Sequence, residues 1–333
     1  MNQIRAIYLN TLPSALPMVT VKCGGSAIRL GCNIEPIFSW YVKNLSAEIT
    51  DNAPDAEVFY VTPSLHPRIL AKEENFAVDF THNRLLFAGK EHYGKMKSLV
   101  SAMASSCRAS QYRQGVHACA FSMNNRGKLL LGDACAGKSF VFLNLLKYCD
   151  FVVTDDWCDI ILENDNVMSA QCLEKNMSVN CNDVNDLVKL KLLSRSMLKL
   201  PAIPHGFRDK IVFPLNKLGT PVRDRVTIKD IYFLVTNDDL RLSSTPGSKE
   251  LNQAFTHISK HIPFCCLSDN KYPFEKVRSV RQKNMIHSIS QDRQRFFQSL
   301  ARSIRSGAVN FYAIPYQKNA ESLKTAVDII RRS

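Results

Sequence analysis

Hydrophobic and polar positions alternate between strand-like and helix-like spacing along the chain, and the clearest succession of elements surrounds residue 132. Residues 128–131 form a short apolar run typical of a buried strand, and a turn at Arg126-Gly127 precedes it. Residues 140–148 are apolar over a longer stretch, which predicts a buried helix. Upstream, residues 116–123 alternate like a strand, so we expect an antiparallel pair to lead into the segment that precedes the helix.

The first part of the chain predicts a small α+β domain, which we place at residues 1–110. Its strands are indicated by β-branched and aromatic residues, and its helices by apolar positions at helical spacing. The predicted elements are helices at 37–45 and 92–107, a strand at 57–62, and a hairpin at 76–80 and 84–88.

The rest of the chain, residues 111–333, predicts a larger domain with a basic helical part near its end. A short strand at residues 151–154 ends in Asp155-Asp156. The other predicted elements are a hairpin arm at 160–163, a helix at 183–199, a strand at 231–235, a helix beginning at Ser248 and an amphipathic helix at 322–332.

The segment between the predicted strand and helix matches the phosphate-binding loop pattern G-x-x-x-x-G-K-[ST] without a gap. In such loops, backbone N–H groups converge on the phosphates of a nucleotide, the lysine reaches the β- and γ-phosphates, and the hydroxyl ligates Mg²⁺. We therefore predict a site for ATP and Mg²⁺. The residues assigned to the nucleotide are Gly132, Asp133, Ala134, Cys135, Ala136, Gly137, Lys138, Ser139 and Phe140.

Composition and charge narrow the class of protein. The chain has 333 residues, of which 45% are hydrophobic and 22% charged, as in ordinary globular proteins. The sequence contains no run of about eighteen apolar residues that would cross a membrane. The net charge of +13 is concentrated between Lys276 and Arg305, where eight basic residues face only Asp292. This stretch predicts either an anionic partner or a solvated helix face.

The eleven cysteines and the N-terminus predict a cytoplasmic protein. The cysteine count is odd, and no C-x-x-C pair is present, so we expect reduced thiols rather than a disulfide framework. Residues 1–16 lack the apolar core of a signal peptide. Cys135 lies inside the loop, where a nearby lysine and helix N-terminus would lower the pKa of its thiol; a small residue chosen for space is the alternative.

His117, the loop from Gly132 to Ser139 and the Asp155-Asp156 pair together resemble the bacterial HPr kinase/phosphorylase family. The resemblance covers residues 115–160 and extends faintly to about residue 240. It implies a P-loop kinase domain of the HPr kinase/PEP carboxykinase type with a mixed sheet. The family includes kinases that act on HPr, on free serine and on a serine of ribosomally made peptides such as lasso peptides.

Two positions depart from the family pattern. Cys135 stands where the family usually has a second loop glycine, and Phe140 stands where HPr kinases have a glutamate. The second change suggests an acceptor other than HPr itself. The stretch after Asp156 also lacks the region that supports phosphorolysis, so the resemblance implies kinase activity more strongly than the reverse reaction.

The resemblance implies that Asp155 accepts the proton of the acceptor hydroxyl, with Asp156 supporting the metal or the loop, and we assign Ser139 and Asp156 to the metal. Adjacent residues at a strand end point to opposite faces, so only one aspartate is expected to face the nucleotide. Solvated turn aspartates are the structural alternative for both.

Three basic residues complete the predicted catalytic set. Lys138 would neutralise the phosphates. His117 would balance the charge of the aspartate, unless it is only a satisfied structural histidine. Arg208 lies in a basic loop, residues 204–210, of the kind that stabilises charge in phosphoryl transfer.

These features favour an ATP-dependent kinase that phosphorylates a serine-bearing peptide or small molecule. The basic stretch would suit an acceptor with acidic groups. A P-loop NTPase or nucleotide-binding module without a phosphoacceptor is the alternative. The basic stretch lacks aromatic interleaving, which argues against a nucleic-acid partner. A homo-oligomer is compatible with the sequence, and no feature fixes its size.

Overall fold

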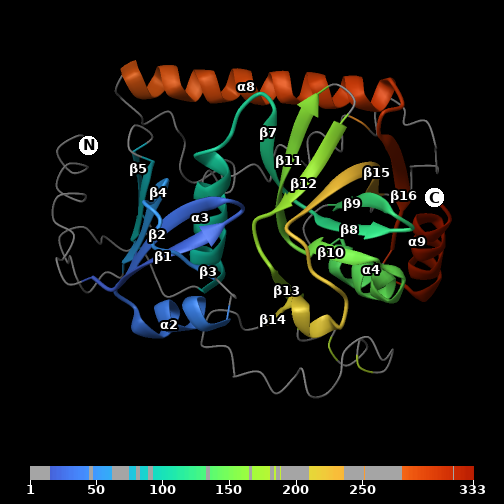
Figure 1. Cartoon of the computed structure of the whole chain (residues 1–333), viewed down its shortest axis with the longest axis horizontal. Helices are drawn as coiled ribbons and strands as arrows, with labels where there is room; N and C mark the ends of the chain where they lie inside the picture. The colour runs from blue at the N-terminus through green and yellow to red at the C-terminus, as the bar shows by residue number, and fades with distance from the viewer. Residues whose placement is uncertain are drawn as a thin grey trace.

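The computed structural model shows a mixed α/β protein with several β-sheets, in agreement with the mixed α/β organisation predicted from the sequence (Figure 1). Its described residues are 16–44, 48–61, 75–79, 83–88, 93–132, 136–164, 167–180, 184, 188, 210–235, 251, 280–317 and 319–333. The predicted helix at 183–199 and the one beginning at Ser248 lie almost wholly outside these ranges.

A six-stranded sheet is built from the first part of the chain, in the order β3-β1-β2-β4-β6-β5. Strands β2, β4 and β6 run parallel, and the other neighbours pair antiparallel. The elements are β1 (Met18–Cys23), β2 (Ser26–Cys32), α2 (Glu35–Asn44), β3 (Glu48–Ile49), β4 (Ala56–Val61), β5 (Asn75–Asp79), β6 (Arg84–Ala88) and α3 (Tyr93–Ser106). The predicted strand, hairpin and two helices of this region are confirmed.

An eight-stranded sheet contains the loop-bearing strand. Its order is β10-β8-β9-β15-β12-β11-β7, with β16 also paired to β15. Its strands are β7 (Arg113–His117), β8 (Cys119–Met123), β9 (Arg126–Gly132), β10 (Phe151–Thr154), β11 (Trp157–Asn164), β12 (Val167–Cys172), β15 (Arg225–Val235) and β16 (Asn310–Pro315). The antiparallel pair that was expected to lead into the loop is β8–β9.

Strand β7 is followed almost directly by β8, and β10 by β11, although the two strands of each of these pairs lie near opposite ends of the sheet order. Only Ala118 separates β7 from β8, and only Asp155 and Asp156 separate β10 from β11. Strands β8 and β10 pair at one end of the order, and β7 and β11 pair at the other. The backbone N–H of Ala118 donates to the carbonyl of Asp156 at 2.9 Å, so the two connections lie side by side.

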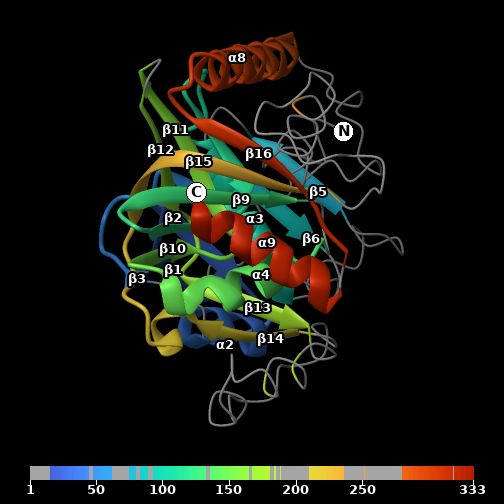
Figure 2. The ribbon, with the colours of Figure 1, turned by 90° about the vertical axis from the view of Figure 1, so that its right-hand side faces the viewer.

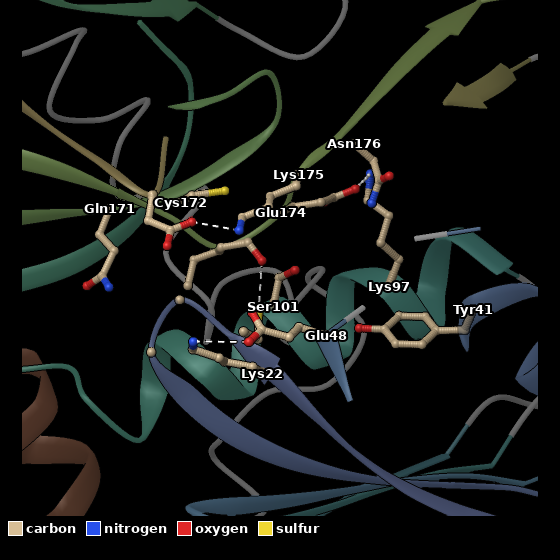
Figure 3. A pocket seen from close by; sticks show the side chains of 15 residues that line it. Lys22, Tyr41, Glu48, Lys97, Ser101, Gln171, Cys172, Glu174, Lys175 and Asn176 are labelled. Atoms are coloured by element: carbon tan, nitrogen blue, oxygen red, sulfur yellow. Dashed lines mark hydrogen bonds and ion pairs between the residues drawn. The ribbon is translucent and has the colours of Figure 1, made fainter. Parts of the chain in front are cut away.

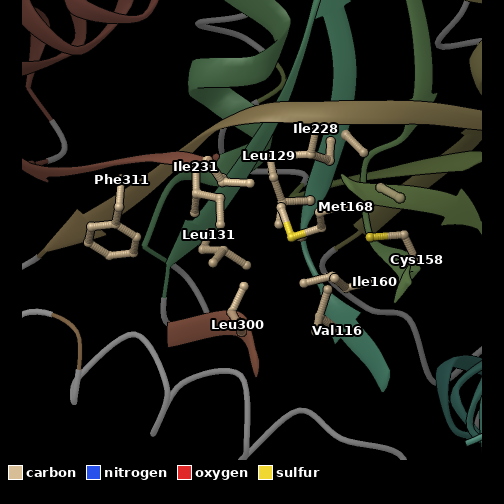
Figure 4. Close-up of a cluster of buried hydrophobic side chains, with 14 of the residues drawn as sticks. Val116, Leu129, Leu131, Cys158, Ile160, Met168, Ile228, Ile231, Leu300 and Phe311 are labelled. Carbon is tan, nitrogen blue, oxygen red and sulfur yellow. The ribbon is translucent and has the colours of Figure 1, made fainter. Parts of the chain in front are cut away.

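Helices cover the eight-stranded sheet with apolar faces. Helix α4 (Lys138–Leu145) lies beside α9 (Ala320–Arg332) in Figure 2, and both pack into one buried cluster with Phe121, Leu130 and Tyr232. Helix α8 (Val280–Arg305) packs Phe296, Leu300 and Ile304 on a second cluster, part of which Figure 4 shows. A separate two-stranded sheet, β13 (Asn176–Asn180) and β14 (Lys210–Pro214), follows β12 and leads into a 3₁₀ turn at Leu215–Leu218.

The described part of the basic stretch forms the outer face of α8. Arg295, Arg302 and Arg305 are exposed, while the apolar residues Phe296, Leu300, Ala301 and Ile304 of the same helix are buried. An amphipathic helix explains this local arrangement. No helix in the described ranges is long and apolar enough to span a membrane.

Candidate active site

The phosphate-loop motif lies between β9 and α4, as the strand–loop–helix pattern predicted. Gly132 ends β9, and Gly137 precedes α4 with φ +93°, in the left-handed region where only glycine is unstrained. Lys138 is buried, and its Nζ donates to the carbonyl of Gly132 at 2.8 Å. Ala136 is buried, and Phe140 is partly buried against the α4–α9 cluster. Asp133, Ala134 and Cys135 lie outside the described residues.

Tyr316 packs directly on this loop. A Cβ atom at Gly137 would lie 2.7 Å from its ring, which is closer than side chains tolerate. Tyr316 follows β16, and its N–H donates to the carbonyl of Val235 at 2.8 Å. The second glycine of the motif is therefore required by backbone conformation and by this contact. The pattern of the loop gave no indication of Tyr316, which lies far away in the sequence.

Sheet topology brings Asp155 to the same end of the sheet as the loop. Strands β9 and β10 are both antiparallel to β8, so they run in the same direction. Asp155 follows β10 and is buried, with 2% of its surface exposed. The hydroxyl of Ser139 donates to its Oδ2 at 3.1 Å, and the thiol of Cys119 lies 3.3 Å from its Oδ1.

Asp156 points away from Ser139, toward a different set of partners. His117 Nε2 lies 2.7 Å from its Oδ1, and Lys97 Nζ lies 2.6 Å from its Oδ2. His117 is the register partner of Trp157, and their rings stack. The two aspartates thus face different partners, as alternation at a strand end predicted.

Lys97 is a second residue of the site that sequence reasoning missed. It comes from α3, beside the six-stranded sheet, and its Nζ lies 2.6 Å from Glu174 Oε1 and 3.3 Å from Ser178 Oγ. The sequence did contain a signal. Lys97 shares a helix face with Val100, Ser101 and Ala104, all buried, and a lysine on the buried face of a helix needs a charged partner.

The two aspartates have opposite protonation tendencies. Burial raises the pKa of Asp155 to about 6, helped by the neighbouring charge of Asp156 and opposed by the bonds from Cys119 and Ser139. Burial would also raise the pKa of Asp156, but Lys97 and His117 outweigh it and hold that pKa well below its usual range. Asp156 is therefore ionised at pH 7, and the pKa of Asp155 lies at about 6.

His117 does not supply the positive charge that balances the Asp156 carboxylate. Burial lowers the pKa of His117, more than the nearby Asp156 raises it. The imidazole is therefore neutral at pH 7 and donates a hydrogen bond. The charges of Asp156 and Glu174 keep the pKa of Lys97 above its ordinary value although burial opposes them. Lys97, rather than His117, supplies the positive charge.

The structure does not place Asp156 beside Ser139 as a second magnesium ligand. Hydroxyl and carboxylate oxygens are the hard ligands that Mg²⁺ prefers, and few are needed when phosphates and water complete the shell. The Asp155 carboxylate already lies within hydrogen-bonding distance of Ser139. Both oxygens of Asp156 are occupied by Lys97 and His117 instead. Within the described ranges, no group of three or more His, Cys, Asp or Glu residues could hold a metal alone. Arg208, the remaining predicted catalytic residue, lies outside these ranges.

The fold and the site together define a mixed α/β protein with a phosphate-loop motif facing a buried aspartate. No family model matches the chain, and no significant match to a curated protein was found. Among solved structures, an HPr(Ser) kinase/phosphatase from Coxiella burnetii is similar over 38% of this chain and 69% of its own, with 19% identity and a TM-score of 0.26. A similarity at this level carries no functional argument.

Proposed function

We propose that the chain is an ATP-dependent kinase of the HPr kinase/PEP carboxykinase type, which transfers the γ-phosphate to a serine hydroxyl of a peptide or small molecule. The observation that carries this proposal is the placement of Asp155, buried and titrating near neutrality, against the loop residue Ser139. A carboxylate with such a pKa, beside a phosphate-binding loop, suits a group that must accept a proton during phosphoryl transfer.

The roles of the residues follow from this placement. Lys138 and the loop N–H groups bind the β- and γ-phosphates. Asp155 accepts the proton of the acceptor hydroxyl as its oxygen attacks the γ-phosphorus, and the bond to the bridging oxygen of ADP breaks. Ser139, with phosphate oxygens and water, would hold Mg²⁺, which neutralises charge on the phosphates when bound. Asp156, fixed by Lys97 and His117, keeps the adjacent Asp155 in position.

The acceptor is proposed to carry acidic groups near its serine. The exposed arginines Arg295, Arg302 and Arg305 of α8 give one helix face a positive charge, and such a face attracts anionic partners. We propose a cytoplasmic location, consistent with the reduced cysteines expected from the sequence.

The test is transfer of labelled γ-phosphate from ATP, with Mg²⁺, to free serine, to peptides ending in serine, and to serine peptides with acidic flanks. Asp155→Asn is expected to lower kcat by about 10²- to 10⁴-fold, the usual contribution of a general base. Lys138→Ala is expected to abolish transfer because the loop loses its phosphate-binding cation. Asp328→Asn, a half-exposed aspartate on α9, is the matched control and is expected to retain activity.

Two outcomes would overturn the proposal. ATP turnover without transfer, surviving in Asp155→Asn, would favour a P-loop NTPase and leave the aspartate pair a structural role. If the wild-type chain does not bind ATP, both the kinase and the P-loop NTPase functions are excluded.

A further inference from the structure

Cys119 lies between the strand that leads into the phosphate loop and the strand that leads into the aspartate pair. It begins β8, which pairs with β9 on one side and with β10 on the other. The register of β8 with β10 sets Ala120 opposite Thr154, so Cys119 lies opposite Asp155. The Cys119 side chain is fully buried in the cluster that α4 and α9 cover.

The thiol of Cys119 contacts Asp155 at two atoms. Its Sγ lies 3.1 Å from the carbonyl oxygen and 3.3 Å from the carboxylate Oδ1. Burial raises the pKa of this thiol well above its usual range, and the charge of Asp155 adds to the effect. Cys119 therefore keeps its proton, and its S–H group is available as a hydrogen-bond donor.

Two further groups contact the Asp155 carboxylate. The hydroxyl of Ser139 donates to Oδ2 at 3.1 Å, and the backbone N–H of Ser178 also donates to the carboxylate. The neighbouring Asp156 is supported from elsewhere, by Lys97, which lines the pocket shown in Figure 3. The thiol is thus a side-chain contact that ties Asp155 to the sheet instead of the loop.

We propose that Cys119 is a positioning residue for Asp155, whose thiol holds Oδ1 so that Oδ2 points to the phosphate loop. The inference rests on the proposed function, in which Asp155 accepts the proton of the acceptor hydroxyl. Ser139 engages the metal when nucleotide and Mg²⁺ are bound, and its hydrogen bond to Oδ2 is then released. The thiol still holds Oδ1, so Oδ2 is both oriented and free to accept the proton.

The kinetic test compares Cys119→Ala and Cys119→Ser with the wild type, using the acceptor that the wild type phosphorylates. Cys119→Ala removes the donor and is expected to lower kcat by about tenfold with KM for ATP unchanged, since displacing a reacting group by about 1 Å can cost about 10²-fold. Cys119→Ser keeps a donor and is expected to recover most of the loss. Cys32→Ala, at a fully buried cysteine of β2 in the other sheet, is the matched control and should keep the wild-type kcat.

A spectroscopic readout that needs no activity tests the hydrogen bond itself. Infrared difference spectra between a protein and its Cys119→Ala counterpart identify the S–H stretching band of Cys119, and Cys119→Ser serves where the alanine variant does not fold. A hydrogen bond to a carboxylate lowers the frequency of this band. In Asp155→Asn the acceptor loses its charge, so the bond weakens and the band is expected to move to higher frequency. In Asp328→Asn the band is expected to stay in place.

The two readouts separate failure of this inference from failure of the proposed function. A wild type that transfers no phosphate overturns the proposed function, and the band still decides whether the thiol holds Oδ1. A band at the same frequency in the wild type and in Asp155→Asn would show that the thiol bonds only the carbonyl of Asp155, and the positioning role would be wrong. A kcat of Cys119→Ala equal to that of the wild type would overturn it as well.

Discussion

At the scale of single residues, the site rests on two neighbours that respond oppositely to protons. Burial raises the pKa of Asp155 to about 6, whereas Lys97 and His117 keep Asp156 ionised by lowering its pKa. Enzymes separate the roles of paired carboxylates in this way, one staying charged while the other exchanges protons. The division of labour is thus set by environment and not by residue type.

This division predicts an acid limb in the pH dependence of the proposed transfer. Asp155 must be ionised to accept a proton, so kcat/KM is expected to fall about tenfold per pH unit below pH 6. Asp156 stays ionised and His117 stays neutral around pH 7, so neither adds a step there. Initial rates measured between pH 5 and 8 check this. A profile that is flat across pH 6 would exclude Asp155 as the base.

At the scale of elements, helix α3 links the six-stranded sheet to the aspartate pair. Its Lys97 is 5% exposed and pairs with carboxylates that follow β10 and β12. Removing one partner of a buried ion pair leaves the other charged group without compensation, and this is more destabilising than losing a surface pair.

The substitution Lys97→Met is therefore expected to lower the free energy of unfolding by about 3 to 5 kcal/mol, measured by urea denaturation. Lys217→Met, at an exposed lysine, is the control and should change it by less than about 0.5 kcal/mol. Adding Glu174→Gln to Lys97→Met removes one of the two buried carboxylates that Lys97→Met leaves without a cation. The double variant should therefore recover part of the lost free energy of unfolding. A double variant less stable than Lys97→Met alone would argue against the buried network.

Local patterns predicted some of the elements, but they missed strands such as β1, β2, β12 and β16, and they could not predict which elements meet. Residues 84–88 and 151–154 alternate or run apolar strongly enough to identify their strands. The loop motif likewise identified Lys138 and Ser139. The contacts of Lys97 with Asp156 and Glu174 span 59 and 77 positions, and no short-range pattern encodes such pairing. Tyr316 escaped prediction for the same reason.

At the scale of the whole molecule, the two sheets share part of one core. Trp157 and Leu173, which belong to the later part of the chain, pack with Leu30, Val58 and Phe87 of the six-stranded sheet. The boundary expected near residue 110 therefore separates two sheets that bury side chains together. Shared burial of this kind favours cooperative unfolding.

We expect a single unfolding transition in urea, with coincident midpoints for circular dichroism and tryptophan fluorescence. Trp157 is buried in the shared core and reports on the contact between the sheets. Trp157→Phe, which leaves Trp40 as the emitter, is the matched comparison. Two separated midpoints would show that residues 1–110 and 111–333 unfold independently.

The side-by-side connections at Ala118 and at Asp155-Asp156 have a thermodynamic consequence. Consecutive Cα atoms are held about 3.8 Å apart, so Asp155 and Asp156 cannot be displaced independently. One aspartate faces the phosphate loop, and the other pairs with Lys97 of α3, which also pairs with Glu174. Nucleotide binding and the Lys97 ion-pair network are thus expected to be linked, and linkage is reciprocal: if a change at Lys97 alters nucleotide affinity, bound nucleotide must alter the stability of that network.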